Sequence, residues 1–195
     1  MPATRGRSRS PVRAKPARAI RARKTAGSRQ LSAISILRAD HKLVDDLFKQ
    51  YEKAKAQSRK QILVDRICRE LTVHATVEEE IFYPAVRSAI KDKDMMDEAD
   101  IEHASARQLI AQLEAGKPGD DHYDAKVKVL GEYIRHHVKE EQTEIFPKAQ
   151  KTKLDMVELG SQIQTRKAEL TMDDRPPRKA AEPAKASILS RLTFR

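Results

Sequence analysis

The sequence has few aromatic residues and almost no cysteine. Phe, Trp and Tyr together make up 4% of the 195 residues, and tryptophan is absent. β-Sandwiches and barrels normally contain more aromatic and β-branched residues, so this composition disfavours an all-β fold. Because Cys68 is the single cysteine, the chain can form neither an intramolecular disulfide nor a cysteine-based zinc site. We expect Cys68 to serve as a small apolar residue on a helix.

Long apolar runs are also missing from the sequence. No stretch approaches the length that spans a membrane, and none resembles the apolar core of a signal peptide. These absences predict a cytoplasmic protein without a membrane partner. Charge, in contrast, is abundant, since Asp, Glu, Lys and Arg make up 35% of the chain. That fraction suits a small helical domain with a modest core and long solvated faces.

The net charge of +10 is distributed unevenly along the chain. Residues 1–30 carry ten Lys or Arg and no acidic residue, whereas residues 31–174 carry 23 basic and 28 acidic residues. Both ends hold little to bury, so we predict disordered basic tails at 1–30 and 172–195. The segment 1–30 also has the composition of a non-specific nucleic-acid or polyanion-binding arm, or of an organelle transit peptide.

Four stretches between the tails carry apolar residues at spacings of three and four, which is the period of amphipathic helices. They cover 34–48, 63–85, 96–113 and 127–145, and the breaks between them are AQSRK (56–60), KDKD (91–94) and GKPGD (116–120). Pro84 and Pro147 should kink or terminate their helices. We predict an all-α fold, an up-down-up-down four-helix bundle over 31–150, followed by an additional amphipathic helix over 151–171.

Two segments of equal length reveal an internal repeat. HATVEEEIFYP (74–84) and HVKEEQTEIFP (137–147) match at the initial His, at a Glu four residues later and at the final Pro. Another His precedes each segment, by 33 residues in one case and by 34 in the other. The bundle is therefore predicted to be a two-helix duplication whose repeated residues are His41, His74, Glu78, His103, His137 and Glu141.

The helical period directs all six of these side chains to the apolar stripes and hence to the middle of the bundle, because residues four apart share a face. A lone core histidine is usually a hydrogen-bonded structural residue, but four histidines on four stripes are hard to explain in that way. Buried carboxylates need compensation, and bound cations supply it. Imidazole and carboxylate ligands suit iron, manganese or zinc, and six ligands in two halves favour a two-ion site.

Neighbouring polar residues are expected to lie outside this site. His136 faces about 100° away from His137, and His122 directly follows a turn. The remaining carboxylates are expected on a solvated face, or at most as partners that orient the histidine rings. They are Glu79, Glu80, Glu140 and Glu144.

The motifs DH (40–41), HATVEEEIFYP and HVKEEQTEIFP, together with the helix around His103, resemble the hemerythrin-like, or HHE cation-binding, domain. The resemblance covers about residues 31–150 and implies a non-haem di-iron centre, with iron favoured over manganese or zinc. It implies that Glu78 and Glu141 bridge two irons. Carried over to this sequence, the ligands are His41, His74, Glu78, His103, His137 and Glu141.

The sequence departs from the oxygen-carrying hemerythrins at one position. Those proteins have a pair of histidines four residues apart on the third helix, but here Arg107 follows His103 at that spacing and Ala99 precedes it. The resemblance therefore implies sensing of, or response to, dioxygen, peroxide, nitric oxide or iron rather than oxygen storage. A di-iron oxidase or peroxidase-like activity rests on family analogy alone, because no substrate pocket is evident.

Overall fold

The computed structural model describes residues 31–91 and 93–173, and all secondary structure in these ranges is helical. This confirms the predicted all-α fold. The elements are α1 (Ala33–Lys53), α2 (Gln57–Val77), η1 (Glu78–Phe82), α3 (Tyr83–Ala89), α4 (Asp94–Glu114), α5 (Tyr123–Glu140), η2 (Glu141–Ile145), α6 (Phe146–Gln150) and α7 (Met156–Asp173). The predicted tails were 1–30 and 172–195; Met172 and Asp173 instead end α7, and residues 1–30 and 174–195 lie outside the described residues.

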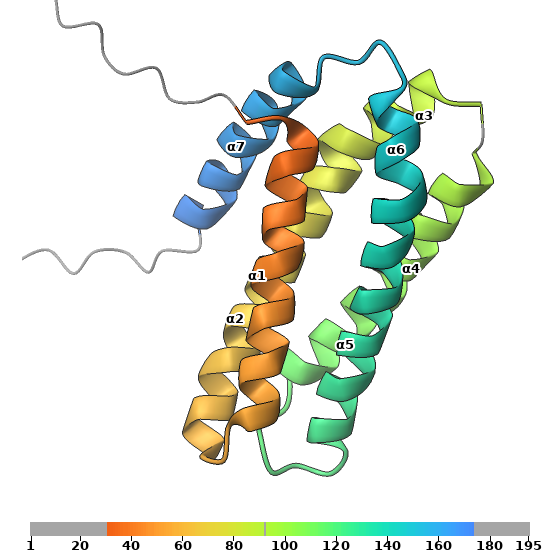
Figure 1. Cartoon of the computed structure of the whole chain (residues 1–195). Helices are drawn as coiled ribbons and strands as arrows, with labels where there is room; N and C mark the ends of the chain where they lie inside the picture. Colours follow the sequence, from red (N-terminus) through yellow and green to blue (C-terminus); the bar gives the residue numbers. More distant parts are fainter. Residues whose placement is uncertain (1–30, 92, 174–195) are drawn as a thin grey trace, which may run out of the picture.

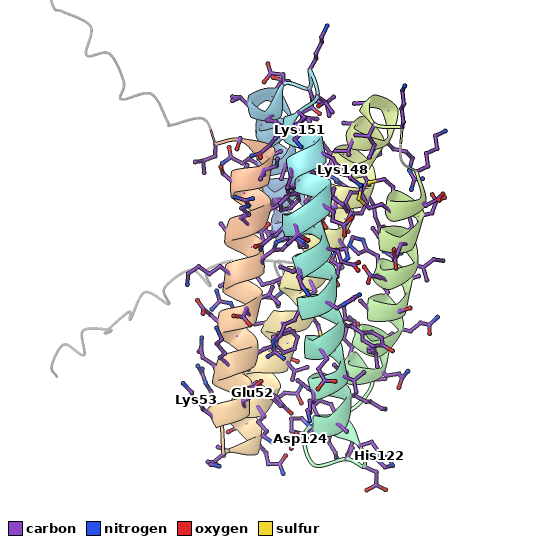
Figure 2. All side chains as sticks on the ribbon, turned by 45° about the vertical axis from the view of Figure 1, so that its right-hand side comes forward. Glu52, Lys53, His122, Asp124, Lys148 and Lys151 are labelled. Carbon is purple, nitrogen blue, oxygen red and sulfur yellow. The ribbon has the colours of Figure 1, made fainter. Side chains whose placement is uncertain are left out.

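The long helices α1, α2, α4 and α5 run in alternating directions and form an elongated bundle (Figure 1). Lys148 and Lys151 lie at one end of this bundle, and Lys53 and His122 lie at the other (Figure 2). None of the helices in residues 31–91 and 93–173 is long and apolar enough to cross a membrane.

The helix boundaries differ from the predicted breaks at two places, one of which is the start of α4 at Asp94, the last residue of KDKD. AQSRK was predicted to separate the first two helices, but α2 already begins at Gln57 and the connection is only 54–56. Gln57 to Lys60 contain no Gly or Pro, so nothing in their backbone opposes a helical first turn. GKPGD does lie in a connection, and Gly119 adopts a φ of 101°, which a residue with a side chain rarely adopts.

The buried apolar residues form two clusters at different heights in the bundle. One lies toward the α1–α2 turn and includes Phe48, Ile67 and Leu130. The other lies toward the opposite end and includes Leu37, Phe82 and Phe146. The repeated His and Glu residues fall between these clusters along each helix, so the polar layer is held in place by apolar packing above and below it.

Both copies of the repeat contain a π-helical turn that begins at the glutamate. In η1 the backbone N–H of Tyr83 donates to the carbonyl of Glu78, and in η2 Phe146 donates to Glu141. Each turn ends just before the proline of its copy, which has no N–H to donate and would clash with a regular helical turn. Single π turns of this kind are frequent at functional sites. The helices therefore lose regularity before Pro84 and Pro147, but continue through them as α3 and α6.

The additional helix predicted over 151–171 is α7, which packs against α1, α2 and η1 of the same chain. Ile163 is the buried apolar residue of α7. Gly160 lets the backbone of α7 lie close to the start of α1, because a Cβ at this position would lie 2.1 Å from the carbonyl oxygen of Leu31. Arg166 of α7 binds Glu80 through two guanidinium nitrogens. The helix thus covers one side of the bundle at the level of the repeated glutamates.

Candidate metal centre

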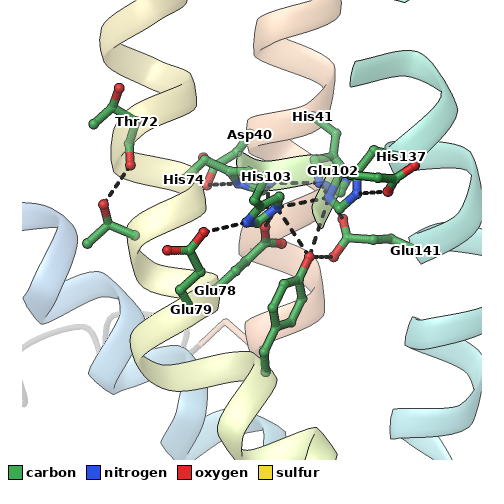
Figure 3. Close-up of polar contacts among 12 residues, drawn as sticks. Asp40, His41, Thr72, His74, Glu78, Glu79, Glu102, His103, His137 and Glu141 are labelled. Carbon is green, nitrogen blue, oxygen red and sulfur yellow. Dashed lines mark hydrogen bonds and ion pairs between the residues drawn. The ribbon is translucent and has the colours of Figure 1, made fainter. Parts of the chain in front are cut away.

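The six predicted site residues converge in the middle of the bundle (Figure 3). Each of the long helices contributes one histidine, and the π turns contribute the two glutamates. Their exposed fractions are between 0% and 6%, and they are the only buried polar or charged residues in the described part of the chain. These residues are His41, His74, Glu78, His103, His137 and Glu141.

The Nε2 atoms of the four histidines face one another in pairs. His41 Nε2 lies 3.0 Å from His74 Nε2, and His103 Nε2 lies 3.1 Å from His137 Nε2. The carboxylates approach the same atoms, since Glu78 Oε2 lies 3.1 Å from His74 Nε2 and Glu141 Oε2 lies 3.0 Å from His41 Nε2. Nitrogen and oxygen lone pairs therefore point into one small volume, as in a metal site.

Two groups of ligand atoms can each hold a metal ion within this volume, and their composition is uneven. The first group contains His41, His74, Glu78 and Glu141, whereas the second contains Glu78, His103 and His137. Glu78 belongs to both groups. Glu141 lies 3.7 Å from His137 Nε2 and belongs only to the first group. The sequence suggested two His and one Glu per half, but the geometry combines ligands from both halves.

The other ring nitrogen, Nδ1, faces a polar residue in every histidine. His137 Nδ1 lies 2.7 Å from Glu102 and His74 Nδ1 lies 3.4 Å from Asp40; each of these acids directly precedes the other histidine of its hairpin. This contact fixes the orientation of a ring whose Nε2 points inward.

In the other two histidines, His103 and His41, the residue that faces Nδ1 belongs to the other helical hairpin. His103 Nδ1 lies 2.9 Å from Glu79, and His41 Nδ1 lies 3.5 Å from the amide of Gln142. Glu79 and Gln142 each directly follow a repeated glutamate. Of the two roles expected for Glu79, the geometry favours that of a partner that orients a histidine ring. Glu80, Glu140 and Glu144 instead contact surface groups.

Tyr83 is a site residue that the sequence analysis missed. Its hydroxyl donates to Glu141 Oε1 at 3.0 Å and lies 3.3 Å from His137 Nε2 and 3.4 Å from His103 Nε2. Asp40, Glu102 and Gln142 were also not assigned to the site. The repeat itself contains a signal for these three, because they stand directly beside repeated residues, but Tyr83 has Phe146 at its equivalent position and no such signal.

The buried carboxylates lack the hydrogen bonds that such groups normally make. Both oxygens of Glu78 and Oε2 of Glu141 have no hydrogen-bond partner within the described residues, although histidine nitrogens lie close to them. Burial and repulsion from Glu141 raise the pKa of Glu78. Buried oxygens without partners cost several kcal/mol, and a bound cation removes that cost. The donor set therefore fits a metal ion.

The buried environment shifts the pKa values of His74 and His103 in opposite directions. Burial favours a neutral His74, but Glu78 and Asp40 outweigh it and raise the pKa of His74 to about 10. Burial, together with the nearby His137, lowers the pKa of His103 to about 4. The pKa of His137, the partner of His103, is raised, because its contact with Glu102 and the charge of Glu141 outweigh burial.

A small cavity of about 60 Å³ lies against the four histidines. Its remaining lining is mainly apolar and includes Val44, Leu71 and Ile110. Arg107, four residues after His103, also borders the cavity, and its guanidinium donates to Glu79. The cavity therefore offers space beside the site where no fifth histidine enters.

Two residues left out of the predicted site are indeed separate from it. The side chain of His136 is 62% exposed, and His122 caps α5 at the far end of the bundle (Figure 2). Cys68 is 1% exposed within the apolar cluster near the α1–α2 turn, as expected for a small apolar residue.

Comparisons with known proteins agree with this geometry. The chain is similar to a hemerythrin HHE cation-binding domain-containing protein from Mycobacterium kansasii, with a TM-score of 0.63 and 20% sequence identity over 73% of this chain and 89% of that one. It is also 30% identical over 111 residues to a DNA nickase from Nostoc. That match covers 57% of this chain and 31% of the relative, so the chain spans about a third of the relative's length.

The sequence profile described as the Hemerythrin HHE cation binding domain matches residues 32–149. This range contains the four long helices, both π turns and every residue of the buried cluster. Since the match extends over more than half of the sequence, the chain belongs to the hemerythrin HHE cation-binding domain family.

Proposed function

We propose that the buried cluster binds two iron ions and that the protein senses or responds to dioxygen, reactive oxygen or nitrogen species, or iron. The observation that carries this proposal is the convergence of six buried His and Glu side chains whose carboxylate oxygens lack hydrogen bonds. The proposed ligands are His41, His74, Glu78, His103, His137 and Glu141. Iron favours this mixture of imidazole and carboxylate, and supplies reversible redox chemistry when bound.

The residues of this chain have distinct parts in the proposal. Glu78, which lies in both ligand groups, would help to hold both ions, and Glu141 would hold one of them while its Oε1 accepts the hydrogen bond of Tyr83. Asp40 and Glu102 hold Nδ1 of His74 and His137, and so keep each Nε2 directed inward. The 60 Å³ cavity beside the histidines is large enough for a diatomic molecule or a peroxide.

Metal analysis of the full-length protein from iron-supplied cells tests this proposal. We expect about two irons per chain and a near-ultraviolet absorption band that disappears in a His74→Ala variant. A well-folded protein that contains less than one metal per chain and does not respond to iron would contradict the proposal.

A second candidate function is non-specific nucleic-acid binding through residues 1–30, with the bundle as cargo. Two observations favour it: the ten basic residues of that segment and the DNA nickase among the relatives. Binding of this kind weakens steeply as salt is raised. We expect duplex DNA to bind the intact chain at low salt and to be released when residues 1–30 are deleted. Equal binding by the two forms would exclude the role of the segment.

Peroxide turnover distinguishes binding from catalysis at the same centre. Wild type and His74→Ala are to be compared at equal protein concentration. Faster turnover by the wild type would indicate site-based catalysis, whereas equal rates would exclude it.

A further inference from the structure

A third group of potential metal ligands lies outside the buried cluster, on the surface shared by α4 and α5. It consists of Glu102, His136 and Glu140, one ligand atom from each lying within 4.8 Å of the others. The His136 side chain is 62% exposed, that of Glu140 32% and that of Glu102 23%. This outer cluster is thus open to solvent, unlike the buried one.

The geometry of the outer cluster is that of a partly assembled metal site. His136 Nε2 lies 3.1 Å from Glu140 Oε1 and 3.7 Å from Glu102 Oε1. Donor atoms that share an ion through bonds of about 2.1 Å have separations of this order. A His–Glu pair four residues apart is by itself an ordinary surface ion pair on a helix. The carboxylate from the neighbouring helix distinguishes this cluster from such a pair.

The outer cluster repeats the spacing of the buried one. His136 and Glu140 stand four apart on α5, one position before His137 and Glu141, which stand four apart on the buried face. α5, together with the first residue of η2, therefore presents one His–Glu pair to solvent and another to the interior. Both pairs lie on helical backbone that packs against α4, so no loop is needed to position their side chains.

Glu102 connects the two clusters directly. Its Oε2 lies 2.7 Å from Nδ1 of the buried His137, while its Oε1 faces the exposed His136. Figure 3 shows the Glu102 carboxylate beside the ring of His137, which is 4% exposed. One carboxylate of the outer cluster thus contacts a proposed ligand of the buried centre directly.

A groove between α4 and α5 joins the same two places. Its volume is about 290 Å³, and it is lined at the surface by His136, Tyr133 and Ile101 and in the interior by His103 and His137. Tyr133 and Ile101 are more than half exposed, and the two inner histidines are buried. The groove thus runs from Glu102 and His136 of the outer cluster to the buried rings, and Glu140 lies outside its lining.

We propose that Glu102, His136 and Glu140 form an outer site for a divalent transition-metal ion, from which ions reach the buried centre through this groove. One imidazole and two carboxylates, with open positions for water, suit Zn²⁺, Fe²⁺ or Mn²⁺. Passage exchanges outer carboxylate and imidazole ligands for inner ones, without any change in oxidation state. The loading role rests on the proposed function of the buried centre, whereas the outer site itself does not.

Zinc binding by the full-length protein tests the outer site. His136→Asn and Glu140→Gln each remove one outer ligand and leave all six buried residues intact. His122→Asn is the matched control, because this exposed histidine lies at the far end of the bundle and asparagine tolerates its φ of 63°. Bound Zn²⁺ per chain is measured by equilibrium dialysis and elemental analysis. We expect both outer-site variants to lose about one Zn²⁺ per chain relative to wild type and His122→Asn.

The rate of iron uptake tests the loading role. Chelator-treated wild type and variants are mixed with Fe²⁺ without oxygen, and iron retained after rapid desalting is measured over time. We expect severalfold slower uptake by His136→Asn and Glu140→Gln, with the same final iron content as wild type.

The outcomes separate the two parts of the proposal. Equal Zn²⁺ binding by wild type and both outer-site variants would overturn the outer site. Loss of one Zn²⁺ with an unchanged rate of iron uptake would overturn the loading role. If the wild type retained no iron at all, the proposed di-iron function would fail, and the zinc comparison would still decide the outer site.

Discussion

Replacing Glu78 with methionine should stabilise the metal-free protein and abolish metal binding at the same time. The Glu78 side chain is fully buried, and neither carboxylate oxygen has a hydrogen-bond partner within the described residues. Burial and repulsion from Glu141 raise its pKa, which shows that the ionised form is unfavourable there. The 3.1 Å approach to His74 Nε2 offsets these effects only in part.

The burial of Glu78 and its contact with His74 together determine how much Glu78→Met should change the free energy of unfolding. A buried polar group without a hydrogen bond costs about 1–3 kcal/mol, and methionine, which has a similar volume, removes that cost at position 78. His74 loses one charged neighbour in the variant but retains Asp40 at 3.4 Å and can release its proton, so a net gain of about 2 kcal/mol is expected. For a chain of this size that free energy corresponds to an increase of about 4–8 °C in the melting temperature.

Thermal unfolding followed by circular dichroism measures both effects. With a chelator present, Glu78→Met should unfold at a higher temperature than wild type. With Fe²⁺ in the absence of oxygen the order should reverse, because an ion that binds only the folded state stabilises it. The control is Glu144→Met in the other copy of the repeat, where the side chain is 55% exposed and the change should be within about 0.5 kcal/mol.

Two results would refute this reasoning. If Glu78→Met were less stable than wild type in chelator, the buried carboxylate would be a net stabilising group and its lack of hydrogen bonds would carry no implication for metal. If Fe²⁺ raised the melting temperature of both proteins equally, Glu78 would not be a ligand.

Three further predictions concern single features of the fold and the site. Burial raises the pKa of the Cys68 thiol to about 12, so iodoacetamide should leave it unmodified at pH 9 until urea unfolds the chain; rapid alkylation of the folded protein would contradict this. Gly160→Ala places a Cβ 2.1 Å from the carbonyl oxygen of Leu31 and should lower the free energy of unfolding in urea by about 1–3 kcal/mol; an unchanged value would show that α7 does not pack as described. Tyr83→Phe removes the hydrogen bond to the Glu141 carboxylate and should destabilise the metal-free protein by about 1.5–3 kcal/mol in the same assay, and equal stability would show that this bond contributes nothing.

The sequence was sufficient to predict the all-α fold and the position of the buried layer, because helical periodicity determines which residues face inward. The apolar stripe predicted over 96–113 includes Met96, Ala99, His103, Ile110 and Leu113, and all five are buried. The same periodicity separated His137 from the exposed His136. These are local properties of one helix, so they can be read without knowledge of its neighbours.

The sequence was insufficient wherever the outcome depends on how helices pack against each other. Tyr83 reaches the site only because the π turn that precedes it rotates the following residues, and regular helical periodicity cannot indicate that rotation. Glu102 is adjacent to His103 in the chain but binds His137 on α5. The position of α7 was also open, since an amphipathic helix can pack on its own bundle or on a partner; Ile163 is buried within this chain.

Crystals of the iron-loaded protein, measured at the iron absorption edge, show whether the buried cluster holds two irons, because anomalous scattering locates each iron among the side chains. We predict two anomalous peaks inside the bundle, one beside His41 and His74 and the other beside His103 and His137, with the Glu78 carboxylate bonded to both ions. The absence of any peak among these residues, or a single ion that Glu78 does not touch, would contradict this prediction.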